Sequence, residues 1–159
     1  MNVLKITSIT GVLSLLLIAM MTAQAAADSV RIGDVIIEAP WARASIGTSR
    51  PAAAYLSIRN EGDEPVTLTQ VSTPVSKMAE IHESTMSDGI ARMGTAGDVV
   101  IRAGSEVVLK PGGLHIMMMK LKQPLKKGEK FNMTLTFKEI EAVDVVLPIL
   151  GVGASGPNK

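Results

Sequence analysis

Hydrophobic and polar residues alternate in short runs along most of this chain. In the clearest run, residues 131–137, apolar side chains occupy every second position: Phe131, Met133, Leu135 and Phe137. Such alternation places the apolar side chains on one face of a β-strand. Shorter or less regular runs predict further strands at residues 30–38, 53–59, 66–72, 78–84, 90–93, 99–102, 106–110, 114–121 and 143–147.

Turn-forming residues separate these runs. Residues 60–65 form the strongest cluster, Pro74 follows the third run, and residues 39–41 are expected to end the first strand. No stretch beyond the N-terminal segment has a helical period, and no internal repeat is detectable. About ten short strands with turns between them indicate an all-β, single-domain fold of the Greek-key β-sandwich or barrel type.

The first 27 residues follow a different pattern. A positive start at Lys5 precedes an apolar run over residues 12–21, and small residues follow at positions 23–27. This combination is typical of a secretory signal peptide, and the Ala-rich ending predicts cleavage after Ala25 or Ala27. The apolar run is shorter than the about 20 residues that a membrane-spanning helix needs. We therefore expect export to the periplasm, with no stable membrane insertion.

The sequence accordingly divides into three parts. Residues 1–27 are the predicted signal peptide, and residues 28–149 are one domain, long enough to bury a core. Residues 150–159 are rich in Gly, lack periodicity and are predicted to be a disordered tail.

Charge and cysteine content narrow the function. The chain has 16 basic and 15 acidic residues, and Lys5 is the only charged residue of the signal segment, so the remainder is balanced. Balanced charge argues against nucleic acid as the main partner. The chain has no cysteine, so a soft metal ligand would have to be methionine. Without a thiol nucleophile or a Gly-x-Ser-x-Gly motif, an enzyme is not expected.

Each of the two histidines has a methionine at a spacing that a β-sheet can use. His115 and Met117 are two residues apart, so on a strand they share a face. Residues 86–89 are expected to form a four-residue hairpin loop, which places His82 directly opposite Met93. Two imidazoles and two thioethers could therefore converge, although a lone strand histidine is often structural and methionine often fills a core.

The chemistry of such a set follows from ligand softness. Thioethers bind Cu(I) well, whereas Zn(II) prefers thiolate, imidazole or carboxylate. All four ligands are neutral, which suits reversible binding. The surrounding residues are interpreted as follows: Met86 and Met119 as candidate exchange ligands, Glu80 either as an acceptor that orients His82 or as a solvated surface acid, and Met78, Met118, Met133, Trp41 and Tyr55 as packing residues.

The spacing of the four ligands resembles that of a known family. His82, Met93, His115 and Met117 are separated by ten, twenty-one and one residues, which matches the PCuAC periplasmic copper chaperones without a gap. The likeness covers roughly residues 32–147. Further landmarks are Trp41-Ala42-Arg43-Ala44, Ala54-Tyr55, Asn60, Pro111-Gly112-Gly113 and Leu121-Lys122-Gln123-Pro124-Leu125.

The resemblance implies a cupredoxin-like fold and a Cu(I)-binding metallochaperone. The expected acceptor is the CuA domain of cytochrome c oxidase or a thiol-bearing copper assembly factor. Ala91 stands where many members of the family have a further methionine, and the tail after Ile149 has no His or Met, so a second copper site in the tail is not expected. Two alternatives stay open, a periplasmic copper buffer and a metal-free interaction module.

Overall fold

The computed structural model describes residues 29–157, so the predicted signal peptide lies outside the described residues. Within this range the chain forms β-strands and no helix. The described residues therefore contain no helix that is long and apolar enough to cross a membrane. The strands are β1 (Val30–Ile32), β2 (Val35–Arg43), β3 (Ala52–Asn60), β4 (Val66–Ser72), β5 (Ser76–Ser87), β6 (Ile90–Thr95), β7 (Val99–Ile101), β8 (Glu106–Leu109), β9 (Leu114–Leu121), β10 (Lys130–Phe137) and β11 (Val143–Leu150).

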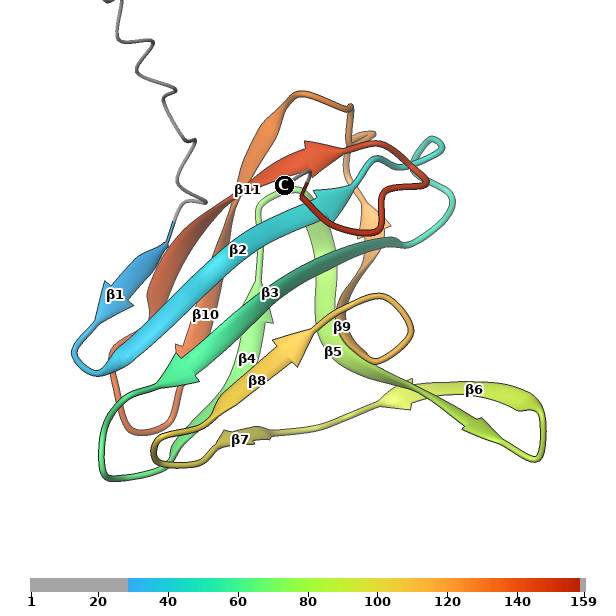
Figure 1. The fold of residues 1–159 in the computed structure, drawn as a ribbon. Helices are drawn as coiled ribbons and strands as arrows, with labels where there is room; N and C mark the ends of the chain where they lie inside the picture. The colour runs from blue at the N-terminus through green and yellow to red at the C-terminus, as the bar shows by residue number, and fades with distance from the viewer. Residues whose placement is uncertain (1–28, 158–159) are drawn as a thin grey trace, which may run out of the picture.

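The strands form one strongly curved sheet in the order β6-β5-β9-β3-β2-β11-β10-β4-β7, with β1 paired to β2 and β8 to β3. In Figure 1 the strands β2, β3 and β11 lie in front of β4, β5 and β10. All pairs are antiparallel except β11 with β2. Strands distant in sequence are neighbours, as β9 lies between β3 and β5. The predicted all-β sandwich or barrel is therefore confirmed.

The core lies between the front layer of β2, β3 and β11 and the layer of β4, β5 and β10 behind it (Figure 1). The predicted inward face of β10 is buried, with Met133 and Leu135 fully covered, and β11 buries Val143, Val145 and Leu147 as its alternation predicts. Ile116 and Met118 of β9 are also fully buried, which agrees with the assignment of Met118 to packing. These apolar side chains set which face of each strand points inward, and hence which face is left for a site.

The first predicted strand, residues 30–38, differs most from the structure, because a turn at Gly33 divides it into β1 and β2. Residues 39–41 do not close the first strand; β2 passes through Ala39 and Pro40 and continues to Arg43. Ala39 has a positive φ of 47°, and the register with β3 shifts between Glu38 and Trp41, so the strand contains a β-bulge here. A bulge is a position where a strand tolerates proline. As a result Trp41 lies opposite Tyr55.

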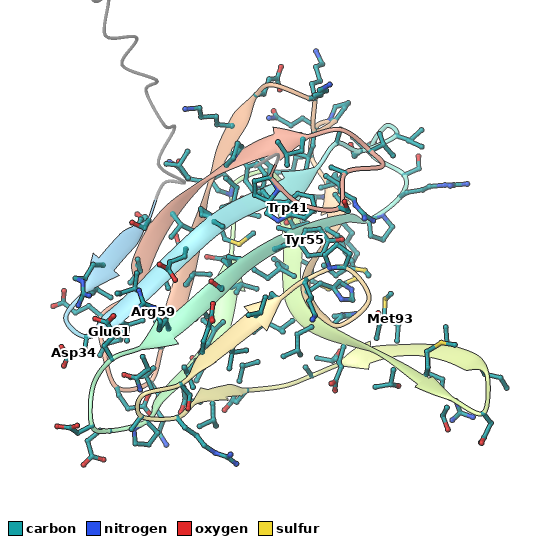
Figure 2. All side chains as sticks on the ribbon, in the orientation of Figure 1. Asp34, Trp41, Tyr55, Arg59, Glu61 and Met93 are labelled. Carbon is teal, nitrogen blue, oxygen red and sulfur yellow. The ribbon has the colours of Figure 1, made fainter. Side chains whose placement is uncertain are left out.

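The Trp41 and Tyr55 rings pack on the outer face of the sheet rather than in the main core (Figure 2). Their centroids are 4.4 Å apart, and both residues are buried. Burial raises the pKa of the Tyr55 phenol, while the nearby Arg43 acts in the opposite direction. The two residues are packing residues, but they belong to a small layer of side chains on the outer face of the sheet, outside the main core.

Part of that layer is the segment after β11, for which the sequence predicts disorder. The structure describes residues 151–157 of this segment: the Ala154 amide donates to the Gly151 carbonyl at 3.0 Å, and Arg43 Nε donates to the Ala154 carbonyl at 2.8 Å. Arg43 also lies over the Tyr55 ring, 5.6 Å from its centroid. Composition gave no sign of this partner, because the contact joins residues far apart in the sequence.

Candidate metal centre

The two histidines meet on neighbouring strands. Strands β5 and β9 are antiparallel, and their register places His82 directly opposite His115. The ring centroids are 6.1 Å apart, and the ring planes are inclined by 55°. Since imidazole nitrogen binds a metal at about 2.0–2.1 Å, an ion between the rings would lie roughly 3 Å from each centroid. The observed separation fits an ion held between them.

The hairpin that carries Met93 differs from the prediction. The loop is the two-residue turn Asp88-Gly89, with positive φ at both residues, rather than residues 86–89. Positive φ at both central residues is typical of a type I′ turn, whose twist matches that of the paired strands. The strands consequently pair further toward the tip, and Met93 lies opposite Ser84 instead of His82.

This register error does not remove Met93 from the site. The true register differs from the predicted one by two residues, and side chains alternate with a period of two, so each keeps its face. Thr95 is now opposite His82, and Met93 is the diagonal neighbour of His82 on the same face. Diagonal neighbours lie about 7–8 Å apart, which long side chains can bridge. Met93 is 57% exposed at the base of the projecting hairpin (Figure 2).

Met117 joins the same face from β9. It is two residues after His115, and the register places it opposite Glu80 of β5. Its side chain is partly buried, and along β9 it lies on the side of His115 that is away from the β5–β6 hairpin. The registers thus place all four predicted ligands on one face of the β6-β5-β9 ribbon, with Met93 and Met117 on either side of the histidine pair, and we call this face the metal face.

The hydrogen bond of His115 determines its free nitrogen. His115 is 5% exposed, and its Nδ1 is 2.9 Å from the Gly113 carbonyl oxygen. A carbonyl only accepts hydrogen bonds, so Nδ1 carries the proton and Nε2 keeps the lone pair. The turn before β9 therefore prepares this imidazole for coordination through Nε2. Such a fixed tautomer is the usual arrangement of a metal-ligating histidine.

His82 is oriented through its other nitrogen. Its Nε2 is 3.3 Å from Oε2 of Glu80, as expected for two side chains that share a face of β5. In neutral His82, donation from Nε2 to the carboxylate leaves Nδ1 as the free nitrogen. The contact agrees with the assignment of Glu80 as an orienting acceptor, and its negative charge lies beside the position of a cation.

No group of three or more His, Cys, Asp or Glu side chains in residues 29–157 is placed to hold a metal ion. Beside the two histidines, the soft donor atoms that the register places on the metal face are methionine sulfurs. Sequence reasoning missed one methionine there: Met78, assigned to packing, is 38% exposed and lies opposite Met119. Its spacing of four residues from His82, an even number on one strand, is the signal that could have placed it on this face.

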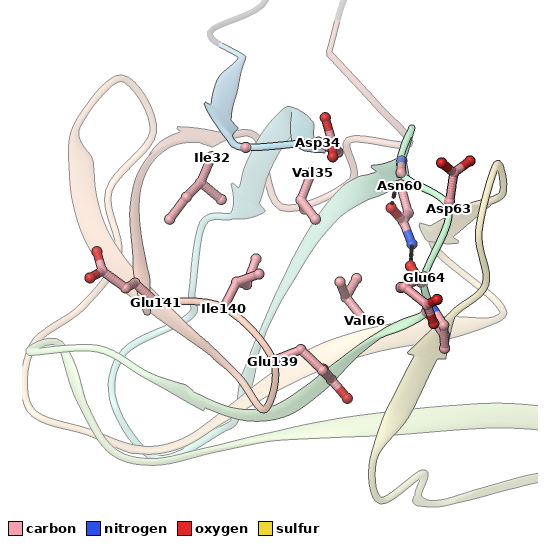
Figure 3. Close-up of a pocket in the computed structure, with 13 residues that line it drawn as sticks. Ile32, Asp34, Val35, Asn60, Asp63, Glu64, Val66, Glu139, Ile140 and Glu141 are labelled. Atoms are coloured by element: carbon pink, nitrogen blue, oxygen red, sulfur yellow. Dashed lines mark hydrogen bonds between the residues drawn. The ribbon is translucent and has the colours of Figure 1, made fainter.

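A separate cavity of about 930 Å³ lies at the end of the molecule formed by the β1–β2, β3–β4 and β10–β11 connections (Figure 3). Acidic side chains line part of it, but the buried Asn60 amide is satisfied by the carbonyls of Glu64 and Ile101. The Glu139 carboxylate accepts hydrogen bonds from the Thr67 amide and hydroxyl. These groups hold loops together, and none of them belongs to the metal face.

Comparison with known proteins identifies the family. The family model named LpqE-like, described as "Putative lipoprotein LpqE-like", matches residues 35–149, which is well over half of the chain. The chain belongs to the LpqE-like family. This is the family of the PCuAC domains, so the resemblance that the ligand spacing indicates is confirmed. Membership also indicates an extracytoplasmic protein.

Relatives of this LpqE-like chain have similar size and fold. "Putative lipoprotein Lxx21020" of Leifsonia xyli subsp. xyli is 29% identical over 133 residues, which cover 83% of this chain and 76% of that protein. The apo PCuAC domain from PmoF1 is 26% identical with a TM-score of 0.67, covering 78% of this chain and 99% of that domain. The structure of CuI-DR1885 from Deinococcus radiodurans is 28% identical with a TM-score of 0.60, covering 81% of this chain and 85% of that chain.

Proposed function

We propose that this protein is a periplasmic copper chaperone that binds one Cu(I) through His82, Met93, His115 and Met117. The observation that carries the proposal is the direct pairing of the two histidines on the face that also holds both methionines. Two imidazoles and two thioethers favour Cu(I) over Zn(II). The likeness to the Cu(I) form of DR1885 supports the same cargo.

A Cu(I) titration against a competing chelator tests the ligand set. Loss of a group that merely orients a ligand typically costs about 10-fold to 100-fold in metal affinity. His115→Ala removes a ligand itself, so its affinity should fall by at least that much. The matched control is Met133→Leu, a core methionine, which should bind like the parent. Parent-like binding by the His115 variant would refute the ligand assignment.

A chaperone, unlike a storage protein, must present its ion to a partner. Met93 is 57% exposed, and the β5–β6 hairpin that carries it extends away from the body of the protein (Figure 1). An incoming ligand can reach the ion from this side. Thioether and neutral imidazole bind copper without losing a proton. When the ion passes to a partner, no ligand is left as an unpaired anion. These features favour delivery over storage.

The acceptor that we propose is the CuA domain of cytochrome c oxidase, or a thiol-bearing factor that assembles it. The PCuAC family supplies this expectation. Loaded protein is mixed with the apo CuA domain, and the transfer rate is measured against acceptor concentration. Direct transfer gives a rate that rises with acceptor. A rate that equals spontaneous dissociation at every concentration would instead favour a copper buffer.

A further inference from the structure

The metal face carries a second pair of soft ligands beyond the four proposed for copper. The register of β5 with β9 places Met78 directly opposite Met119. Directly opposed residues have Cβ atoms about 4.5–5.5 Å apart, well within the reach of two thioether side chains. Neither side chain is buried: Met78 is 38% exposed, and Met119 is partly exposed. Their sulfur atoms can therefore meet on an open surface.

A third thioether adjoins this pair. Met117 precedes Met119 by two residues on the same strand face and is the diagonal neighbour of Met78. One strand step of two residues is about 6.6–6.8 Å, so the Met78–Met119 pair and the histidine pair lie on either side of Met117. Core packing does not account for the arrangement, because the inward face of this part of β9 is occupied by Ile116 and Met118.

We propose that Met78, Met117 and Met119 form a second Cu(I) position, adjacent to the first and sharing Met117 with it. The inference rests on the proposed function, since it concerns the same ion. Three thioethers are soft, neutral ligands that select Cu(I) over harder ions. The set lacks imidazole, so it binds the ion less tightly than the first position does.

The second position gives the ion a path along the face. Bonds from copper to the two imidazoles and to the Met93 sulfur break as bonds to Met78 and Met119 form, while the Met117 sulfur stays bound. Copper remains Cu(I) throughout, and no proton or electron is transferred. Glu80 lies opposite Met117, between the two positions, so its carboxylate compensates the positive charge in both. Copper can thus leave the paired histidines without first entering water.

The test isolates the three thioethers in the full chain. His82→Ala/His115→Ala removes both imidazoles, and Cu(I) binding is followed by competition and by NMR of ¹³C-labelled methionine methyl groups. We expect affinity to fall by at least about 100-fold but not to vanish. The methyl signals of Met78, Met117 and Met119 should shift. Adding Met78→Leu/Met119→Leu should abolish the remaining binding, whereas adding Met133→Leu, a fully buried core methionine, should not.

A second measurement decides the matter even if loss of the buried His115 unfolds the protein. Met78→Leu/Met119→Leu in the otherwise unchanged chain replaces two surface residues, and it should keep Cu(I) affinity but slow copper release to a chelator. Release at the parent rate would overturn the second position, as would a folded double-histidine variant with no residual binding. If the parent itself binds no Cu(I), the proposed function fails as well, so the two failures are distinguishable.

Discussion

Replacing Met117 and Met118 separately by leucine should separate metal binding from folding. The two residues are adjacent, but they point to opposite faces of β9. Met118 is fully buried in the core, and Met117 lies on the metal face opposite Glu80. The same chemical change is thus made one residue apart. Only Met117→Leu removes a proposed copper ligand.

The expected magnitudes follow from these positions. Met117→Leu should weaken Cu(I) binding by at least about 10-fold to 100-fold. At about 1.4 kcal/mol for each factor of ten, that is roughly 1.4–2.8 kcal/mol of binding free energy. Met118→Leu should leave the affinity nearly unchanged, because its side chain is directed away from the ion. Each leucine variant should change the free energy of unfolding by less than about 1.5 kcal/mol, since the exchange conserves volume.

The assay pairs a Cu(I) competition titration with urea unfolding of the apoprotein. Met118→Ala extends the comparison, because truncating a buried methionine should destabilise the fold by about 2–5 kcal/mol without touching the ligands. The reasoning is refuted if Met118→Leu weakens copper binding as much as Met117→Leu does. It is also refuted if Met117→Leu binds copper like the parent.

Three further outcomes are expected. Only neutral imidazole coordinates, so protons compete with copper, and Cu(I) affinity measured by competition should fall as pH drops from about 7 to about 5. Glu61 accepts a hydrogen bond from Arg31, which lowers the pKa of Glu61 below its ordinary value of 4.5. The ionised carboxylate therefore stabilises the folded state, and this stability is lost as pH falls through the lowered pKa. Glu61→Gln has no such carboxylate, so it should lose less stability in acid than the parent does. Gly89→Ala forces a side chain into a φ of +76°, so the β5–β6 amides should exchange hydrogen faster, unlike those of Gly94→Ala.

Flat copper affinity over that pH range would mean that the methionines hold the ion without the histidines. An unchanged acid profile in Glu61→Gln would show that this ion pair contributes no measurable stability. Equal amide exchange in Gly89→Ala and Gly94→Ala would mean that the left-handed turn does not hold the hairpin.

Alternation was enough to place most strands. The predicted limits of β4 and β9 agree with the structure to the residue, because each is bounded by turn residues and packs one apolar face. It failed at β2, where the strand bends through Ala39 and Pro40 at a bulge. Proline normally interrupts a strand pattern, and only pairing with β3 on the far side of the bulge reveals that the strand continues.

The face of each proposed ligand was also predictable, since parity along a strand is a local property. His115 and Met117 share a face in any strand, and Met93 kept its face despite a hairpin register wrong by two residues. What the sequence by itself determined is therefore most of the strands, their inward faces and the shared face of His115 and Met117. Period-two alternation specifies all of these without reference to other strands.

Only the tertiary structure decided which strands are neighbours. The contact of His82 with His115, the exposure of Met78 and the docking of residues 151–157 on Arg43 all depend on pairs distant in the chain. Alternation says which way a side chain points but not what lies opposite it. That choice is made by the packing of the whole sheet around its core, and the position of β9 between β3 and β5 is what assembles the metal face.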